Sequence, residues 1–159
     1  MDLERAMAVA KKYETLLDPL CERIAIAGSV RRRRPFPGDI EIVCIPKMRD
    51  MYEFAGIVNS WPAVKGKPTG HYTQRLLPEG IKLDLFIATR DNWGLIFAIR
   101  TGSKEYSHRV LAAGWVKKGF KSEAGVLVDY KGYPHFIREE EELFELIGVP
   151  FLDPTNREI

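Results

Sequence analysis

Two carboxylates lie two residues apart in a stretch that otherwise has the composition of a β-strand. The stretch covers residues 38–45 and reads GDIEIVCI, so its β-branched residues favour a strand whereas its acids do not. Side chains alternate between the two faces of a strand, so Asp39 and Glu41 share one face and Ile40 and Ile42 share the other. The pattern therefore predicts an apolar core face and a face with two carboxylates.

A second predicted strand repeats this arrangement with a third acid. Residues 81–88 read IKLDLFIA, which places Asp84 opposite an apolar face. If the two strands are neighbours, Asp39, Glu41 and Asp84 converge, and their repulsion would raise their pKa values unless a divalent cation neutralised them. Carboxylate oxygens without soft ligands favour Mg²⁺ or Mn²⁺. The alternative is that the three acids lie on the solvated face of a sheet.

A phosphate-binding turn is indicated shortly before the first acidic strand. Residues 24–32 read IAIAGSVRR, a short strand that ends in Gly28 and Ser29 and continues into arginines. Glycine lets a backbone approach phosphate closely, and a serine hydroxyl, the N–H groups at a helix start and arginine can bind phosphate. Such a turn is common by itself, but here the acidic strand follows it closely. The combination predicts a triphosphate site beside the acids.

The remaining pattern predicts two consecutive parts. An amphipathic helix at 2–19 is followed by strands at 23–27 and 40–45, a helix at 51–59, a strand at Val64, and a hairpin of strands 72–77 and 81–88. From residue 92 the pattern changes to helices at 93–100 and 104–118, a small hairpin at 122–130 and an acidic helix at 138–147. We therefore expect one part over residues 1–91 and another over residues 92–159.

Composition argues against several other classes of protein. The 159 residues are 45% apolar, enough to bury a core without disulfides, and Cys21 and Cys44 lack the spacing of a zinc or disulfide framework. No apolar run approaches the roughly 18 residues that would span a bilayer, and no signal-peptide core is present. We expect a soluble, intracellular, cytoplasmic protein without a membrane partner, with a nucleoid or viral context also open.

Taken in order, these motifs resemble the nucleotidyltransferase core of family X DNA polymerases, the family of DNA polymerase beta. The palm signature of that family, Gly-Ser-x-Arg-Arg, then Gly-Asp-x-Asp and a third Asp on a later strand, is matched by residues 28–32, residues 38–41 and Asp84. Its thumb signature, Thr-Gly-Ser between two helices, is matched by residues 101–103. The resemblance covers essentially the whole chain. It implies an α+β fold with a nucleotidyltransferase-type palm, a mixed sheet flanked by helices, followed by a small helical and hairpin thumb.

The same resemblance implies a DNA polymerase that transfers a nucleotide from a dNTP to a primer 3′-hydroxyl and fills short gaps in DNA repair. Asp39 and Glu41 would bridge two metal ions, Mg²⁺ or Mn²⁺, while Asp84 would bind the catalytic ion and help to activate the hydroxyl. The partners would be a dNTP and primer-template or gapped DNA, and the chain would act as a monomer. The implied nucleotide-binding residues are Gly28, Ser29, Arg32, Gly38, Gly102, Ser103, Tyr106 and Ser107, and the implied DNA-binding residues are Lys82, Arg100, Lys104 and His108.

One departure from the family pattern affects the site, and two other functions stay open. Glu41 stands where the family usually has Asp, which favours slow or Mn²⁺-dependent activity because Mg²⁺ tolerates poor geometry badly. The first alternative is a nucleotidyltransferase that acts on a protein, an RNA or a small molecule, and residues 101–103 argue against it. The second is a DNA-binding scaffold whose site has decayed, and the retention of all three acids argues against that.

Overall fold

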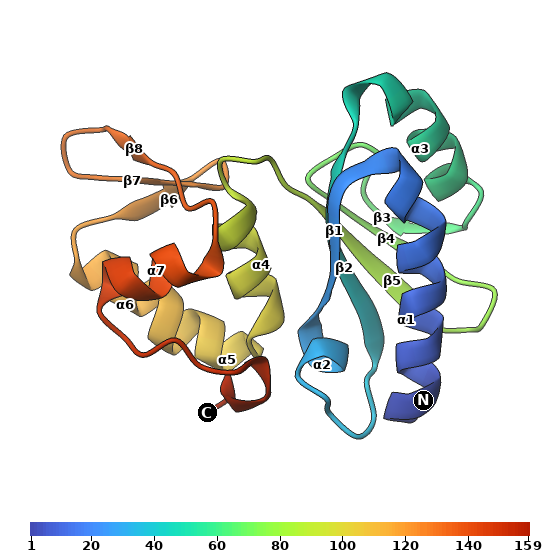
Figure 1. Ribbon diagram of the computed structural model, residues 1–159, viewed down its shortest axis with the longest axis horizontal. Coiled ribbons are helices and arrows are strands. Elements are labelled where there is room, and N and C mark those ends of the chain that lie inside the picture. Colours follow the sequence, from blue (N-terminus) through green and yellow to red (C-terminus); the bar gives the residue numbers. More distant parts are fainter. The chain divides into compact units, whose positions relative to one another are not determined.

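The computed structural model describes residues 1–159 and divides into two compact units, Met1–Ala88 and Thr89–Ile159. Figure 1 shows the elements of each unit. The sequence placed this boundary slightly later, after residue 91. Each unit has its own cluster of buried apolar side chains, so each is described by itself.

The first unit is built on a mixed five-stranded sheet with the order β1-β2-β5-β4-β3. The central strands β2 and β5 run parallel, and each other neighbouring pair is antiparallel. A turn at 78–80 joins β4 to β5 as predicted, with the Leu77 amide donating to the Ile81 carbonyl at 3.0 Å. The strands are β1 (Cys21–Ala27), β2 (Asp39–Pro46), β3 (Ala63–Lys65), β4 (Tyr72–Leu76) and β5 (Lys82–Ile87).

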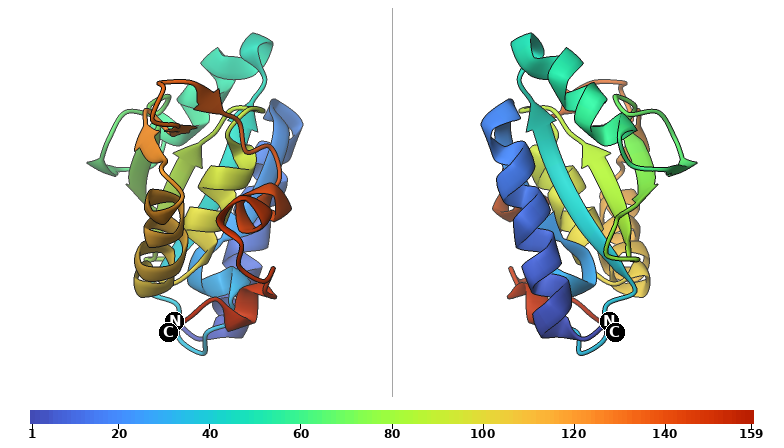
Figure 2. Two further views of the ribbon diagram at one scale, coloured as in Figure 1. Left: turned by 90° about the vertical axis from the view of Figure 1, so that its left-hand side faces the viewer. Right: turned by 90° about the vertical axis from the view of Figure 1, so that its right-hand side faces the viewer.

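Two helices, α1 (Leu3–Leu17) and α3 (Met51–Asn59), cover one face of this sheet, as the right-hand view of Figure 2 shows. Apolar residues of α1, α3, β2 and β5 form one buried cluster, with Ala10, Phe54 and Ile42 fully buried in it. The helix-covered face thus takes the apolar residues of the central strands. A one-turn helix, α2 (Gly28–Arg31), follows β1, and short 3₁₀ turns lie at Asp18–Leu20 and Met48–Asp50.

The second unit packs helices with a small antiparallel sheet. Its core contains Leu95 from the first helix, Leu111 and Trp115 from the next helical segment, and Phe144 from the last helix. The predicted helices at 93–100, 104–118 and 138–147 are confirmed within a few residues, but a π-helical stretch at Ser107–Ala112 and a third strand were not predicted. The elements are α4 (Trp93–Thr101), α5 (Lys104–Tyr106), the π-helical stretch, α6 (Ala113–Lys117), β6 (Lys121–Glu123), β7 (Val126–Val128), β8 (Pro134–His135), α7 (Glu140–Ile147) and a 3₁₀ turn at Pro154–Asn156.

The helices of both units are too short or too polar to cross a membrane.

Candidate active site

Asp39, Glu41 and Asp84 lie on the face of the first unit's sheet that points away from α1 and α3. In the parallel register of β2 and β5, Glu41 stands beside Asp84 and Asp39 stands beside Lys82. The isoleucine between the two acids, Ile40, is fully buried on the helix side. The two strands predicted to carry the acids are therefore neighbours, and the acids share one face.

Asp39 and Asp84 interact directly. The pKa of the Asp39 carboxyl is raised, first by burial, then by the negative charge of Asp84 and by a hydrogen bond between the two carboxyl groups. The positive charges of Lys82 and Lys65 act in the opposite direction without outweighing these effects. The negative charge of Asp84 is thus one cause of the raised pKa of Asp39, and a divalent cation bound between the two carboxyl groups would relieve that repulsion.

Two polar residues of β4 hold the Asp84 carboxylate from the other side. The Tyr72 hydroxyl donates to Oδ1 of Asp84 at 2.5 Å, and Nε2 of Gln74 donates to the same oxygen at 2.8 Å. Burial and the hydrogen bond to Asp84 raise the pKa of the Tyr72 phenol, and the charges of the three acids add to this effect. The phenol therefore stays protonated as a donor. Asp84 itself is only 5% exposed, so these partners take the place of water around its carboxyl group.

Sequence reasoning missed Tyr72 and Gln74, although a signal for Gln74 was present. The predicted turn at 78–80 sets the register of the hairpin, and in that register Gln74 stands directly opposite Asp84. A polar side chain opposite a buried acid on the same face of an antiparallel pair is a ready hydrogen-bond partner. The register alone would therefore have indicated Gln74 as a partner of the third acid.

The Glu41 carboxylate lies against Gly28, at the end of β1. A Cβ atom built on Gly28 would lie 1.5 Å from Oε2 of Glu41, so the glutamate carboxylate occupies the space above that glycine. Gly28 has a φ of +63°, a conformation that glycine adopts without strain. The Gly28 turn and the second acid are thus in contact, whereas the predicted convergence of all three carboxylates on one point is not seen.

The donor set at Asp39 and Asp84 fits a hard divalent cation. Both side chains offer carboxylate oxygens, and the repulsion between them, which helps to raise the pKa of Asp39, is one that a cation would neutralise. Tyr72 and Gln74 use one oxygen of Asp84 and leave the other to different partners. No group of three or more His, Cys, Asp or Glu side chains is arranged to hold a metal ion, which agrees with the position of Glu41 against Gly28.

The predicted triphosphate residues surround the turn that follows β1. The amide of Arg32 donates to the Gly28 carbonyl and the amide of Arg34 donates to the Ser29 carbonyl, both at 3.0 Å, which closes the one-turn helix α2. Ser29 and Arg32 are half-buried, while Gly38 is exposed and would meet nothing within 4 Å if it carried a Cβ. Triphosphate binding by these residues stays a prediction.

A cavity of about 440 Å³ adjoins Asp39 at the edge of the sheet. Arg5, Gly38, Asp39 and Lys82 contribute to its lining. Its volume is in the range of small-molecule sites, and it places two basic side chains beside the first acid. Lys82, predicted to contact DNA, is exposed at this edge.

In the second unit, the Thr-Gly-Ser segment forms a closely packed turn between α4 and α5. Ser103 caps α5, with its Oγ accepting from the Tyr106 amide at 3.1 Å, and the Ser107 hydroxyl donates to the Ile99 carbonyl at 2.7 Å. A Cβ atom on Gly102 would lie 2.8 Å from the Tyr106 ring and 2.9 Å from Oγ of Ser107. A glycine is therefore required for this close approach.

Of the other site residues predicted in the second unit, one is buried and three are exposed. Tyr106 is 3% exposed, belongs to the core, and its hydroxyl has no hydrogen-bond partner. Its packing role is clear, and a contact with a nucleotide stays a prediction. Arg100, Lys104 and His108 are exposed, so they are accessible to DNA, which also stays a prediction.

Arg157 supports this turn and was not anticipated. Its carbonyl accepts from the Ser103 amide at 3.1 Å. Its guanidinium is fully buried, donates to Oε2 of Glu140 at 2.5 Å, and lies 4.9 Å and 5.1 Å from the ring centroids of Phe144 and Phe151. The segment after α7 is thus anchored into the core and fixes one side of the Thr-Gly-Ser turn.

Comparison with known proteins gives a fold but no sequence family. No protein-family model matches the sequence, and no curated protein sequence matches it. Among solved structures, the chain aligns with polymerase beta of Leishmania infantum in a ternary P/T complex, with a TM-score of 0.71 and 17% identity over 100% of this chain and 77% of that chain. This chain has a DNA polymerase beta-like fold. The predicted α+β class with a palm and a thumb is confirmed, and we use palm as the name for the first unit and thumb as the name for the second.

Proposed function

We propose that this chain is a metal-dependent DNA polymerase that adds a nucleotide from a dNTP to a primer 3′-hydroxyl and fills short gaps in DNA repair. The observation that carries the proposal is the pair of carboxyl groups of Asp39 and Asp84, which lie in hydrogen-bond contact on adjacent parallel strands, with Tyr72 and Gln74 bound to Asp84. The polymerase beta-like fold supports it, since the Leishmania protein was solved as a ternary P/T complex. The chain would act as a monomer on primer-template or gapped DNA.

The chemistry assigned to the site is an in-line displacement at phosphorus. The primer 3′-oxygen forms a bond to the α-phosphorus, the bond from that phosphorus to the β-phosphate oxygen breaks, and pyrophosphate leaves. When bound, Mg²⁺ or Mn²⁺ ions neutralise charge on the attacking and leaving oxygens. Asp84 would orient the 3′-hydroxyl, Asp39 would join it in binding cations, and Ser29 with Arg32 would hold the triphosphate.

The position of Glu41 restricts how the site could hold two metal ions. A site with two ions requires a carboxylate shared between them, and the Glu41 side chain would have to turn from Gly28 toward Asp84 to supply it. Its longer side chain makes that turn possible. The same position against Gly28 favours a second candidate, a DNA-binding scaffold with a decayed site, because there the carboxylate blocks the approach of a phosphate to the glycine.

Single-nucleotide incorporation on gapped DNA separates these functions. The wild-type chain should extend the primer with Mn²⁺ and more slowly with Mg²⁺, and Asp84→Ala should lower the rate at least a thousandfold, because the acid acts at the reacting atoms. Glu53→Gln is the matched control, since Glu53 is an exposed acid on α3, and it should act as wild type. Absence of extension by the wild-type chain with either ion would favour the scaffold, and equal rates for Asp84→Ala and wild type would refute the site.

A further inference from the structure

Two tyrosines stand exposed on a tight turn of the second unit. The turn covers residues 129–133 between β7 and β8, and we name it the tyrosine turn. Tyr130 is 85% exposed and Tyr133 is 64% exposed. Large aromatic side chains left in water together mark a binding surface more often than a packing surface.

The side-chain carboxylate of Asp129 holds the backbone of the tyrosine turn in place. Oδ1 of Asp129 accepts from the amides of Lys131 at 2.9 Å and Tyr133 at 3.0 Å, and Oδ2 lies 2.9 Å from Nε2 of His135. The Asp129 amide donates to the Tyr133 carbonyl at 3.0 Å, and Gly132 adopts a φ of +86° that completes the turn. The backbone that carries the tyrosines is thus preorganised, which lowers the entropy cost of binding through them.

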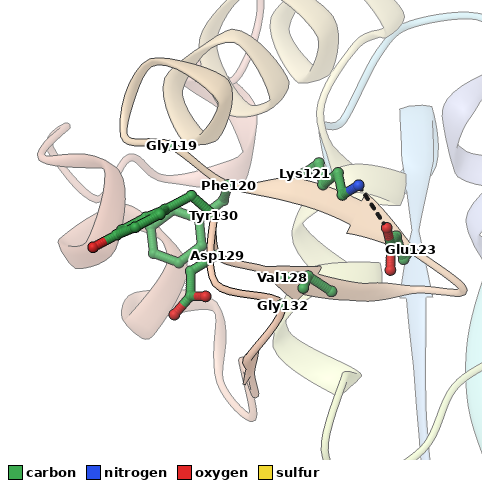
Figure 3. Close-up of a pocket in the computed structure, with 8 residues that line it drawn as sticks. All are labelled: Gly119, Phe120, Lys121, Glu123, Val128, Asp129, Tyr130 and Gly132. Atoms are coloured by element: carbon green, nitrogen blue, oxygen red, sulfur yellow. Dashed lines mark ion pairs between the residues drawn. The ribbon is translucent and has the colours of Figure 1, made fainter.

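A pocket of about 400 Å³ opens beside the turn, as shown in Figure 3. Phe120, Val128 and Tyr130 give it an apolar and aromatic lining, and Asp129 and Lys121 add polar groups at its edge. Its volume lies within the range of small-ligand sites. A flat ring with polar edges, such as a nucleobase, matches this lining.

Lysines lie at the tip of the turn and in the lining of the pocket. Lys131 is at the tip of the turn, with its Nζ 5.6 Å from the Tyr130 ring centroid. Lys121, on β6, lines the pocket and pairs with Glu123 at 2.9 Å, and Asp129 pairs with His135. Lys131 therefore places positive charge beside an exposed aromatic ring.

We propose that the tyrosine turn and its pocket bind single-stranded DNA. Bases would stack on Tyr130 and Tyr133, and the backbone phosphates would contact Lys131. Aromatic rings interleaved with basic side chains are the usual means of binding single strands without sequence preference. Taking this strand to be the unpaired template rests on the proposed function, whereas the binding itself does not.

Fluorescence anisotropy with a labelled oligonucleotide of about 16 nucleotides, a length that single-strand sites occupy, tests this site. The full chain is compared as wild type, Tyr130→Ala/Tyr133→Ala, and Tyr130→Phe/Tyr133→Phe, against single-stranded DNA, single-stranded RNA and blunt duplex DNA. Tyr52→Ala is the matched control, because Tyr52 is 94% exposed on α3. The alanine pair should weaken binding of single-stranded DNA at least tenfold and leave the duplex unchanged, while the phenylalanine pair and Tyr52→Ala should bind as wild type.

Each outcome of this experiment supports or overturns the proposed single-stranded DNA site. Equal affinity of the alanine pair and wild type for single-stranded DNA, with unchanged circular dichroism, overturns the site and leaves a protein partner as the use of the turn. A loss seen only with RNA overturns the choice of DNA. Asp84→Ala separates this inference from the proposed function, because this variant should lose primer extension and keep tyrosine-dependent binding of single-stranded DNA. A wild-type chain that binds single-stranded DNA through the tyrosines but does not extend a primer would refute the polymerase function alone.

Discussion

Tyr72 and Asp84 are joined by a 2.5 Å hydrogen bond from the phenol to Oδ1 of the carboxylate. The bond lies on the face of the palm sheet that α1 and α3 do not cover. The amide of Gln74 reaches the same oxygen at 2.8 Å. Two donors on one oxygen fix the orientation of the carboxyl group. Tyr72 and Gln74 are therefore positioning residues for Asp84.

Removing these donors should slow the chemical step without weakening dNTP binding. Hydrogen bonds to a charged group contribute about 1.5 to 3 kcal/mol, so Tyr72→Phe and Gln74→Leu should each lower the single-turnover rate by about ten- to a hundredfold. Unchanged single-turnover rates in both variants would show that the two contacts do not serve the site.

Shortening Glu41 should help rather than harm Mg²⁺-dependent activity. In Glu41→Asp the carboxylate loses its reach to Gly28 and stays near the face shared by Asp39 and Asp84. We expect the rate with Mg²⁺ to be retained or raised and the ratio of the Mn²⁺ rate to the Mg²⁺ rate to fall, measured on gapped DNA. Complete loss of activity in this variant would show that the site requires Glu.

Glu79 ties the β4–β5 turn to α1 and should make the palm sensitive to acid. The Tyr13 hydroxyl donates to it at 2.6 Å and Nζ of Lys12 at 2.8 Å. Burial by itself would raise the pKa of Glu79, but these hydrogen bonds outweigh it, so the pKa is lowered from its ordinary value of 4.5. A lowered pKa means that the stabilisation is present above pH 4.5 and is lost as the pH falls through the folded-state pKa.

Glu79→Gln should therefore lower the free energy of unfolding by about 0.5 to 1 kcal/mol at pH 7, the scale of a partly exposed ion pair. Near pH 3 the difference between variant and wild type should shrink. Urea unfolding followed by circular dichroism at both pH values measures it. A difference that is constant with pH would assign the effect to packing instead of charge.

Arg157 should be a large contributor to the stability of the thumb. Truncation of one partner of a buried ion pair costs about 3 to 5 kcal/mol, and Arg157→Ala removes the arginine that pairs with the buried carboxylate of Glu140. Arg109→Ala, which removes an exposed partner 3.9 Å from Glu105, should cost less than about 0.5 kcal/mol. Urea unfolding compares the two, and similar values would contradict the role given to the buried pair.

The sequence was sufficient for the arrangement of the acids on the sheet. Apolar alternation identified β2 and β5 and the face of each acid, because a one-residue error would have put Asp39 or Asp84 into the core. The hairpin turn at 78–80 also fixed the register from which Gln74 follows. These features depend on a period of two and a turn, both of which are local in the chain.

Other features were beyond sequence reasoning. Alternation gives the face of Glu41 but not its side-chain torsions, so its approach to Gly28 depends on the neighbouring strand. The strand β8 has only Pro134 and His135, too short for any periodic signal. To predict the burial of Arg157, one would have to know that the segment after α7 returns to the Thr-Gly-Ser turn. No local pattern in the sequence specifies such a contact.

Binding of Mn²⁺ to the carboxylate pair tests the central claim most directly. Titration at neutral pH, followed by the electron paramagnetic resonance of free Mn²⁺, should show binding by the wild-type chain and by Glu53→Gln. Asp39→Asn and Asp84→Asn should each weaken that binding at least tenfold, because carboxylate oxygens are the ligands. Equal Mn²⁺ affinity in all four proteins would contradict the assignment of Asp39 and Asp84 as a cation site.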